Sequence, residues 1–419
     1  MAVGLVVSVR YSVLVGELRT GRRLVALPYM SGSWSVAAGA AGDMTVKVPT
    51  RAAEFMRLEP RMTGGLWPGP DVYPSETTFP RAVVTRWVPG SSPRRDLAAA
   101  TEPTRTFLAV LADDRVIEAG PIWRRDEDDG VLTIKALGLK SLWDKRLLLS
   151  HLTDWATPGA VAASSLSYSG LSLGTIQKRI VQEALAHLAG SVPVVFRADE
   201  PGTSTRTYPG FEVATVGQRL DELAQVENGP EFDFTARLSA DRTGVEWEMR
   251  TGTAENPQLV QAGMDWMVDA TVARGNLGGL SISEDATNTV NRAWAKGAGT
   301  DEATVISVPA TAPDRWDAGY PLLESVGSVG GDGGTYQDNV NRHAAGDLAA
   351  SDRPVLTWRL KVAVDSRVGA ARPGDWWSIR VGDDHVLTTP GLYRARMASM
   401  SGDLTGEFVD VYLAPTEVE

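Results

Sequence analysis

The segment Gly170-Leu171-Ser172-Leu173-Gly174 matches the nucleophile-elbow pattern, in which a serine at a strand-to-helix turn attacks an ester or another acyl group. An esterase would also need an acid and a histidine later in the chain, and His343 and His385 are available. That enzyme fold requires a mostly parallel sheet, whereas this sequence predicts antiparallel hairpins. Because a serine directly before an amphipathic helix commonly caps it, we interpret Ser172 as an N-cap.

Acidic residues, histidines and glycines also form clusters, but none completes a metal or phosphate site. Asp126–Gly130 resembles a calcium loop, yet placing its glycine sixth puts Arg125 and Ala136 where an Asp and a Glu are required. Asp383-Asp384-His385 fits a hairpin tip, the four histidines lack zinc-peptidase spacing, and Gly330–Gly334 lacks the lysine of a phosphate loop. We expect no catalytic residue, cofactor or metal. A glycosidase carboxylate pair stays open, because such pairs have no fixed spacing.

Aromatic residues are the remaining candidates for function, since the chain contains 13 tryptophans. Trp67, Tyr73 and Trp87 lie in the proline-rich stretch Glu54–Pro103 and are candidate partner contacts. Proline cannot donate hydrogen bonds to a sheet, so we expect this stretch to lie outside the first barrel. We also expect proteases to cut it first in the free protein.

The composition excludes several classes of protein. The chain has 419 residues, no cysteine and a net charge of −11, which removes disulfides, thiolate chemistry and a broad basic surface for nucleic acid. No run of about 18 apolar residues exists, so we expect no membrane-spanning helix. The apolar start, Met1–Leu18, lacks a basic region and alternates like a strand, so we interpret it as a first strand and not as a signal peptide.

Short alternating apolar runs predict an antiparallel β meander at the start of the chain. The turns are Thr20-Gly21, Ala112–Arg115 and Asp126–Gly130. The expected strands are Tyr11–Leu18, Arg23–Leu27, Asp43–Val48, Phe107–Leu111, Val116–Ile117, Ile122–Arg125 and Val131–Ala136.

The middle of the chain has a different, α+β pattern. The spacing of apolar residues predicts helices over Leu173–Ala189 and Val216–Glu227, the second with a capping box at Thr215 and Gln218. A hairpin follows, with its turn near Asp241. The expected hairpin strands are Phe232–Leu238 and Val245–Met249.

The last part returns to β structure with one helix, Tyr336–Leu348. Its expected strands are Val355–Val364, Trp376–Val381, Gly391–Met400 and Glu407–Leu413. The fold class is therefore mainly β, with two antiparallel β-barrel domains flanking an α+β middle region. The expected domains are 1–145 (a first barrel with an insertion at about 54–103), 146–284 and 285–419.

Three segments resemble the baseplate hub, or minor tail, proteins of long-tailed actinobacterial phages. The first is the strand Thr106–Leu111 followed by Asp113–Trp123, with its acidic turn and Gly-Pro-Ile-Trp step. The others are Asn288–Gly297 and Arg372–Asp375, which leads into Trp376–Val381. The order of these segments, more than any one of them, carries the resemblance over nearly the whole chain.

The resemblance implies two related barrels of the tail-tube type that alternate around a homotrimeric ring in the virion, at the tail tip. The ring would contact the distal tail protein, the tape measure protein and tail fibres or other tip proteins, and would be made in the host cytoplasm. DNA would pass through it transiently, so we expect its channel to carry more Asp and Glu than Arg and Lys. The proline-rich insertion departs from the family pattern, and we expect a bare hub without a spike or lysin domain after the last barrel.

Two other classes of function stay open at this point. One is an enzyme that degrades the cell envelope, either an esterase built on Ser172 or a glycosidase. The other is a tail protein that binds a glycan or receptor through Trp67, Tyr73 and Trp87. A structural, non-enzymatic hub is the favoured interpretation.

Overall fold

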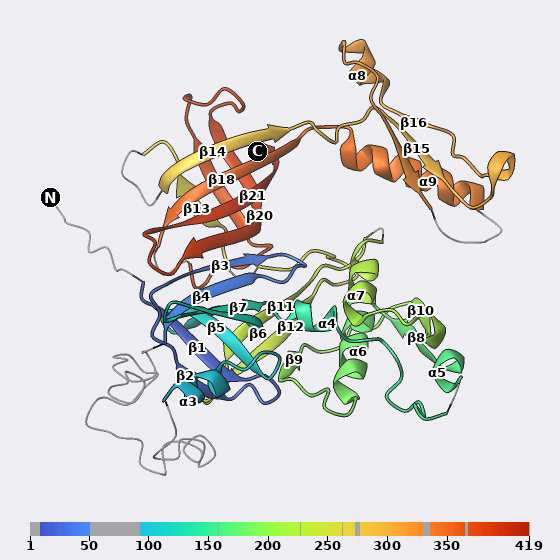
Figure 1. Cartoon of the computed structure of the whole chain (residues 1–419). Coiled ribbons are helices and arrows are strands. Elements are labelled where there is room, and N and C mark those ends of the chain that lie inside the picture. The colour runs from blue at the N-terminus through green and yellow to red at the C-terminus, as the bar shows by residue number, and fades with distance from the viewer. Residues whose placement is uncertain are drawn as a thin grey trace. The chain divides into compact units, whose positions relative to one another are not determined.

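The structure, a computed structural model, describes residues 9–50, 93–157, 159–226, 228–261, 263–272, 277–329, 336–364 and 368–418. The chain divides into two compact units (Figure 1). The first comprises Met1–Gly279, Leu360–Val381 and Leu392–Glu419, and the second comprises Leu280–Arg359 and Gly382–Gly391. Three of the described strands have residues in both units: β14 (Leu277–Asp285), β18 (Val355–Ala363) and β20 (Gly391–Asp403).

The first β segment forms an antiparallel sheet with one face on the core. In β4 the side chains of Met44, Val46 and Val48 are buried and their neighbours face outward, which is the period of two of a half-buried strand. Neighbouring strands follow the order β3-β4-β7-β6-β5-β1-β2. The bounds are β1 Tyr11–Glu17, β2 Arg23–Ala26, β3 Ser31–Ala37, β4 Asp43–Pro49, α3 Pro93–Ala100, β5 Thr106–Ala112, β6 Arg115–Asp128 and β7 Val131–Leu137.

The middle region contains two capped helices and a hairpin. Ile176, Ile180 and Ala184 lie at helical spacing on the buried face of α6, and hairpin β11–β12 pairs Phe232 with Thr251. A third strand, β9, runs parallel to β12. The bounds are α4 Lys140–Trp143, α5 Ala160–Ala163, β8 Ser165–Leu171, α6 Leu173–Ala186, β9 Val194–Phe196, β10 Ser204–Pro209, η1 Gly210–Glu212, α7 Val216–Ala224, β11 Phe232–Leu238 and β12 Val245–Thr251.

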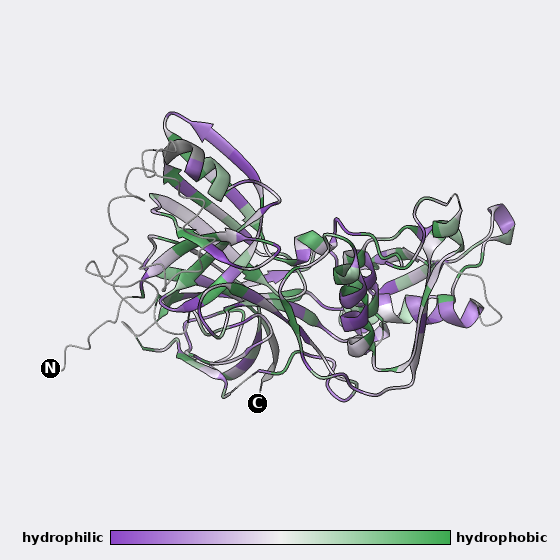
Figure 2. Cartoon of the chain, turned by 90° about the horizontal axis from the view of Figure 1, so that it is seen from below, coloured by the Kyte–Doolittle hydropathy of each residue, from purple (hydrophilic) through white to green (hydrophobic). Residues whose placement is uncertain are grey.

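One hydrophobic core joins the first β segment to this middle region. It includes Phe107 from β5, Trp143 from α4, Ile176 from α6, Leu220 from α7 and Trp247 from β12, all almost fully buried. Figure 2 shows hydrophobic residues gathered along the strands of the large sheet. Because these side chains come from both regions, the strands and helices of this core stabilise one another.

The last β segment has strand order β14-β18-β21-β20, with β19 beside β20 and β13 beside β19. Its strands carry side chains that are almost fully buried, among them Trp358, Trp377, Ile379 and Val411. The further bounds are β13 Trp266–Asp269, β19 Trp376–Val381, β20 Gly391–Asp403 and β21 Phe408–Val418.

The second unit contains a small sheet of order β16-β15-β17 with helix α9 packed on one face. Val340 and Ala344 of α9 are buried against Ala295 of β15. The bounds are β15 Arg292–Lys296, η2 Asp301–Ala303, β16 Ala310–Thr311, α8 Pro313–Asp317, β17 Glu324–Ser328 and α9 Tyr336–Ser351.

The fold class expected from the sequence is confirmed: the chain is mainly antiparallel β with helices in the middle region. Helices α6 and α7 begin at the predicted residues, and each ends three residues before its predicted end. The two strands expected within Val116–Arg125 are one continuous strand, β6. The stretch Glu54–Pro103 ends in helix α3, whose Leu97 is buried; its preceding residues, up to 92, lie outside the described residues.

Candidate functional site

The residues singled out as partner contacts, Trp67, Tyr73 and Trp87, lie outside the described residues. The esterase candidate Ser172 is described and is 3% exposed. Its Oγ accepts a hydrogen bond from the backbone N–H of Thr175 at 3.1 Å and donates one to Thr175 Oγ1 at 3.0 Å. Ser172 is thus the N-cap of α6, as interpreted from the sequence.

Ser172→Ala is expected to lower the free energy of unfolding of the first unit by about 1 kcal/mol, because the Thr175 N–H loses its capping partner. Ser172→Asn should recover most of this loss, since an asparagine side chain can accept the same bond. Chemical denaturation followed by circular dichroism measures both. An alanine variant as stable as the unmodified chain would contradict the capping role.

The first and last β segments are joined by main-chain pairing between β3 and β20, which lie side by side in Figure 1. Ser33–Ala37 of β3 pair antiparallel with Ser399–Asp403 of β20. The Ala38 N–H donates to the Ala398 carbonyl at 3.0 Å, and the Leu404 N–H donates to the Gly32 carbonyl at 2.8 Å. The sheet therefore runs without interruption from one segment into the other.

Side chains from the sequence motif Arg372–Asp375 reinforce this junction. The partly buried Arg372 guanidinium donates to the carbonyl of Val116 in β6 at 3.0 Å, and desolvation lowers its pKa. The Asp375 carboxylate accepts from the Arg372 N–H at 2.9 Å and from Trp266 Nε1 at 3.0 Å. The Asp375 carboxylate thus closes the turn Arg372–Asp375, and the Arg372 side chain bonds this turn to β6 of the first β segment.

A second tie links the last segment to the middle region. Arg396 of β20 forms a bidentate ion pair with Glu231, which immediately precedes β11. Glu231 also accepts from the Leu259 N–H at 3.0 Å, and despite its partial burial these partners lower its pKa. Bidentate arginine–carboxylate pairs fix orientation as well as distance, so this pair constrains how β20 and β11 lie relative to each other.

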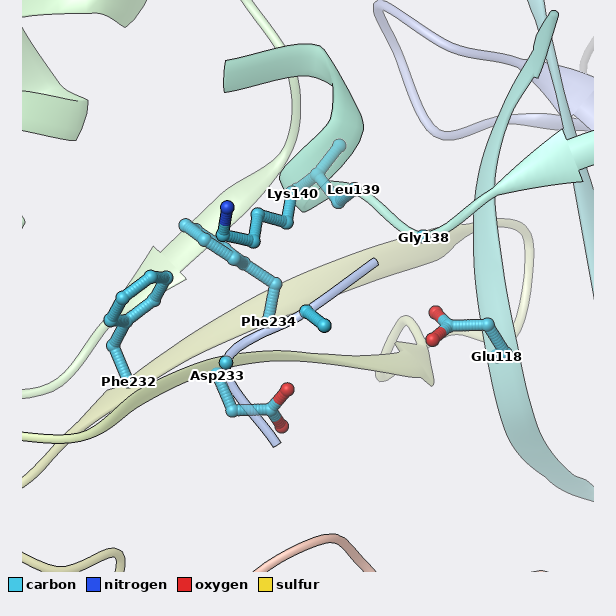
Figure 3. A pocket seen from close by; sticks show the side chains of 9 residues that line it. Glu118, Gly138, Leu139, Lys140, Phe232, Asp233 and Phe234 are labelled. Carbon is cyan, nitrogen blue, oxygen red and sulfur yellow. The ribbon is translucent and has the colours of Figure 1, made fainter. Parts of the chain in front are cut away.

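A small recess beside Glu118 lies next to this junction, and Figure 3 shows the Glu118 carboxylate pointing into it. Strand β6 supplies Glu118, the turn before α4 supplies Gly138 and Leu139, and hairpin β11–β12 supplies Phe232, Asp233 and Phe234. The Glu118 carboxylate can lie against the backbone of Gly42 because glycine has no side chain: a Cβ at Gly42 would lie 2.5 Å from Glu118 Oε2.

Glu118 is 9% exposed, and its Oε1 accepts a 2.8 Å bond from the Ala119 N–H. Burial raises the pKa of Glu118 to about 8, and nearby Asp233 adds to the rise. The Ala119 bond and the charge of Arg372 oppose it. The carboxyl is therefore mostly protonated at neutral pH, which the sequence did not predict; a single acid within the apolar run Val116–Ala119 was the available signal.

The recess has room for about one water molecule. Among the residues that the structure describes, no three histidine, aspartate or glutamate side chains lie close enough together to hold a metal ion. No described helix is both long and apolar enough to cross a bilayer. We therefore take the junction of the two β segments, formed by β3 and β20, as the candidate functional site of the described chain.

Two solved structures have a similar overall fold over nearly their whole length. A tail protein from Neisseria meningitidis MC58 is 12% identical, with a TM-score of 0.50 covering 97% of this chain and 96% of that one. The 43 kDa tail protein of prophage MuSo2 from Shewanella oneidensis is 8% identical, with a TM-score of 0.51 covering 97% and 98%. The chain has a phage tail-protein fold. No family model and no curated protein matches its sequence, so the tail-protein fold rests on structure alone.

Proposed function

We propose that this chain is a structural hub protein, or minor tail protein, at the tip of a phage tail. Three copies would form a ring that continues the tail tube. The proposal rests on one observation: the tail-protein fold is matched from end to end, including the two β segments that β3 and β20 fuse into one sheet. Three chains with two such segments each would supply six similar blocks around an axis, and a closed ring removes exposed sheet edges.

In this role the ring would contact the distal tail protein, the tape measure protein and tail fibres, and DNA would pass through it transiently. It would reside at the tail tip of the virion after synthesis in the host cytoplasm. A non-enzymatic role is consistent with Ser172, whose hydroxyl is engaged as a helix cap. The binding of a glycan or receptor by Trp67, Tyr73 and Trp87 stays a prediction.

The purified chain is expected to reach a mass three times 44.9 kDa as its concentration rises, because the ring buries edges that a single copy leaves exposed. Native mass spectrometry across a concentration series measures this stoichiometry. A monomer that is seen at low concentration and gives way to a trimer at higher concentration is compatible with the proposal. A dimer or tetramer as the end point, or a chain that stays monomeric at every concentration, would contradict it.

A further inference from the structure

The first and last β segments repeat one strand plan. Side by side, the first has the order β3-β4-β7-β6-β5-β1 and the last has the order β14-β18-β21-β20-β19-β13. Read position by position, these orders match β3 with β14, β4 with β18, β7 with β21, β6 with β20, β5 with β19 and β1 with β13. The matched strands also follow one another in the same order along the chain. One pair departs from the plan, because β1 runs antiparallel to β5 whereas β13 runs parallel to β19. The plan makes β3 the counterpart of β14, and β20 the counterpart of β6.

Details of these strands support the correspondence. Opposite β7, the register of β6 shifts at Trp123, and opposite β21 the register of β20 shifts at Ala398. Both are bulges in the second half of a long hairpin strand. Strand β3 reads Ser-Gly-Ser-Trp-Ser-Val-Ala and β14 begins Leu-Gly-Gly-Leu-Ser-Ile-Ser. In both, a glycine and one further small residue are followed by a large apolar residue, a serine and a β-branched apolar residue, so Trp34 corresponds to Leu280 and Val36 to Ile282.

The two halves differ in what lies beyond the bulge. In β20, Ser399–Asp403 follow the bulge and pair with β3. In β6, Arg124–Asp128 follow the bulge and, within the described chain, pair with β7 alone. On its other edge, β6 pairs with β5 as far as Pro121. One further backbone bond on that edge runs from the Thr104 N–H to the Ile122 carbonyl. Among the described residues, Arg124–Asp128 therefore have no strand partner on the side where β20 pairs with β3. The Arg125 guanidinium donates to the Ala98 carbonyl and to Thr101 Oγ1 at the end of α3.

The counterpart of β3 also has a free edge. Strand β14 ends the sheet, with β18 as its one neighbour among the described strands. Trp34 and Val36 of β3 are 1% and 6% exposed, whereas their counterparts Leu280 and Ile282 in β14 are only partly buried. This edge carries no proline or lysine, the residues that commonly protect an edge from pairing.

We propose that β14 of one copy pairs with Arg124–Asp128 of β6 in a second copy, in the register that joins β3 to β20. Ser281 then lies opposite Asp126, as Ser35 lies opposite Ser401. In the same register Ser283 lies opposite Arg124 and Glu284 lies opposite Trp123, so the acidic end of β14 approaches the end of the β6 segment that carries its two arginines. This inference rests on the proposed trimer and deepens it. Each copy offers one edge of each kind, so the contact is head-to-tail and can close into a ring.

Engineered disulfides test this register, because the chain contains no cysteine. The bonds at Ala38 and Leu404 make Ser35–Ser401 a non-hydrogen-bonded pair, whose Cα atoms lie about 4.5 Å apart, within disulfide range. The equivalent test pair is Ser281→Cys with Asp126→Cys. The full chain is oxidised mildly, and its covalent mass is measured on a non-reducing gel beside native mass spectrometry. Covalent dimers and trimers that disappear on reduction are expected.

Two controls are matched to the test pair. Ser35→Cys with Ser401→Cys should form its disulfide within one chain and leave the mass monomeric. Ser281→Cys with Glu127→Cys shifts the register by one residue and should yield about tenfold less covalent product, since a one-residue shift turns the thiol to the other face of the sheet.

The outcomes separate this inference from the proposed function. A native trimer that gives no covalent product with the test pair would overturn the strand assignment and leave the hub proposal standing. Covalent dimers from Ser281→Cys alone would overturn it in favour of pairing between two β14 strands. A chain that forms no trimer at any concentration would overturn both.

Discussion

Glu118→Gln is expected to raise the unfolding temperature of the first unit at pH 9 and to leave it nearly unchanged at pH 4. The side chain is buried beside Asp233, and burial raises its pKa from 4.5 to about 8. Glutamine has the same shape but carries no charge, so it removes the cost of an ionised carboxylate in this recess. The gain at high pH is on the order of 5 kcal/mol, at about 1.4 kcal/mol for each pKa unit.

The direction with pH follows from proton binding. Below the unfolded pKa of 4.5, Glu118 is neutral in both states and imposes no penalty. Between 4.5 and about 8 the unfolded chain releases the proton while the folded chain keeps it, so the free energy of unfolding falls as pH rises. Above about pH 8 the full penalty is present. Calorimetry at several pH values measures it, with exposed Glu127→Gln on the same strand as the control. Parallel curves for the unmodified chain and Glu118→Gln would contradict the prediction.

Trp247→Ala is expected to destabilise the first unit by about 3 to 5 kcal/mol. The indole is fully buried, its ring meets Phe107 edge to face at 5.6 Å, and its Nε1 donates to the Ala119 carbonyl at 2.9 Å. The substitution removes a large side chain from a core that the hairpin shares with the first β segment. The loss should therefore appear in the whole unit and not in the middle region alone.

Two measurements check this expectation. Urea denaturation should give a lower midpoint by both circular dichroism and fluorescence, with the two transitions still coincident. Trp247→Phe, which keeps most of the apolar volume, should cost much less than Trp247→Ala. A variant in which only the helices α6 and α7 unfold early would show that the shared core does not couple the two regions.

Local features of the fold were predictable from the sequence because they are decided by neighbouring residues. Ser172 and Thr215 cap their helices through residues three positions later, so their roles are visible as a pattern. Hairpin β11–β12 follows likewise from alternation around a turn near Asp241. The continuity of β6 was missed, because Gly120-Pro121 indicates a break, whereas both residues pair with β5.

The candidate site depends on contacts between distant parts of the sequence, and for that reason it was not predicted. The residues near Ser33 do not indicate that it pairs with Asp403 in the sheet, because this pairing depends on how the two β segments fold against each other. Glu118 is equally ordinary as a strand residue. Its burial results from Gly42 on one side and hairpin β11–β12 on the other.

The pairing of β3 with β20 also has a consequence for the order of folding. The ribosome releases β3 long before Ser399–Asp403 emerge, so an early strand must wait for a partner that lies far later in the sequence. Contacts so far apart in sequence close slowly, because a long loop must lose conformational entropy before the contact stabilises it. Until then the edge of β3 stays open to other chains, as strand edges do in partly folded proteins. Completion of the sheet therefore waits for the synthesis of β20, and a chain interrupted before Ser399 would expose an unpaired β3 edge and aggregate.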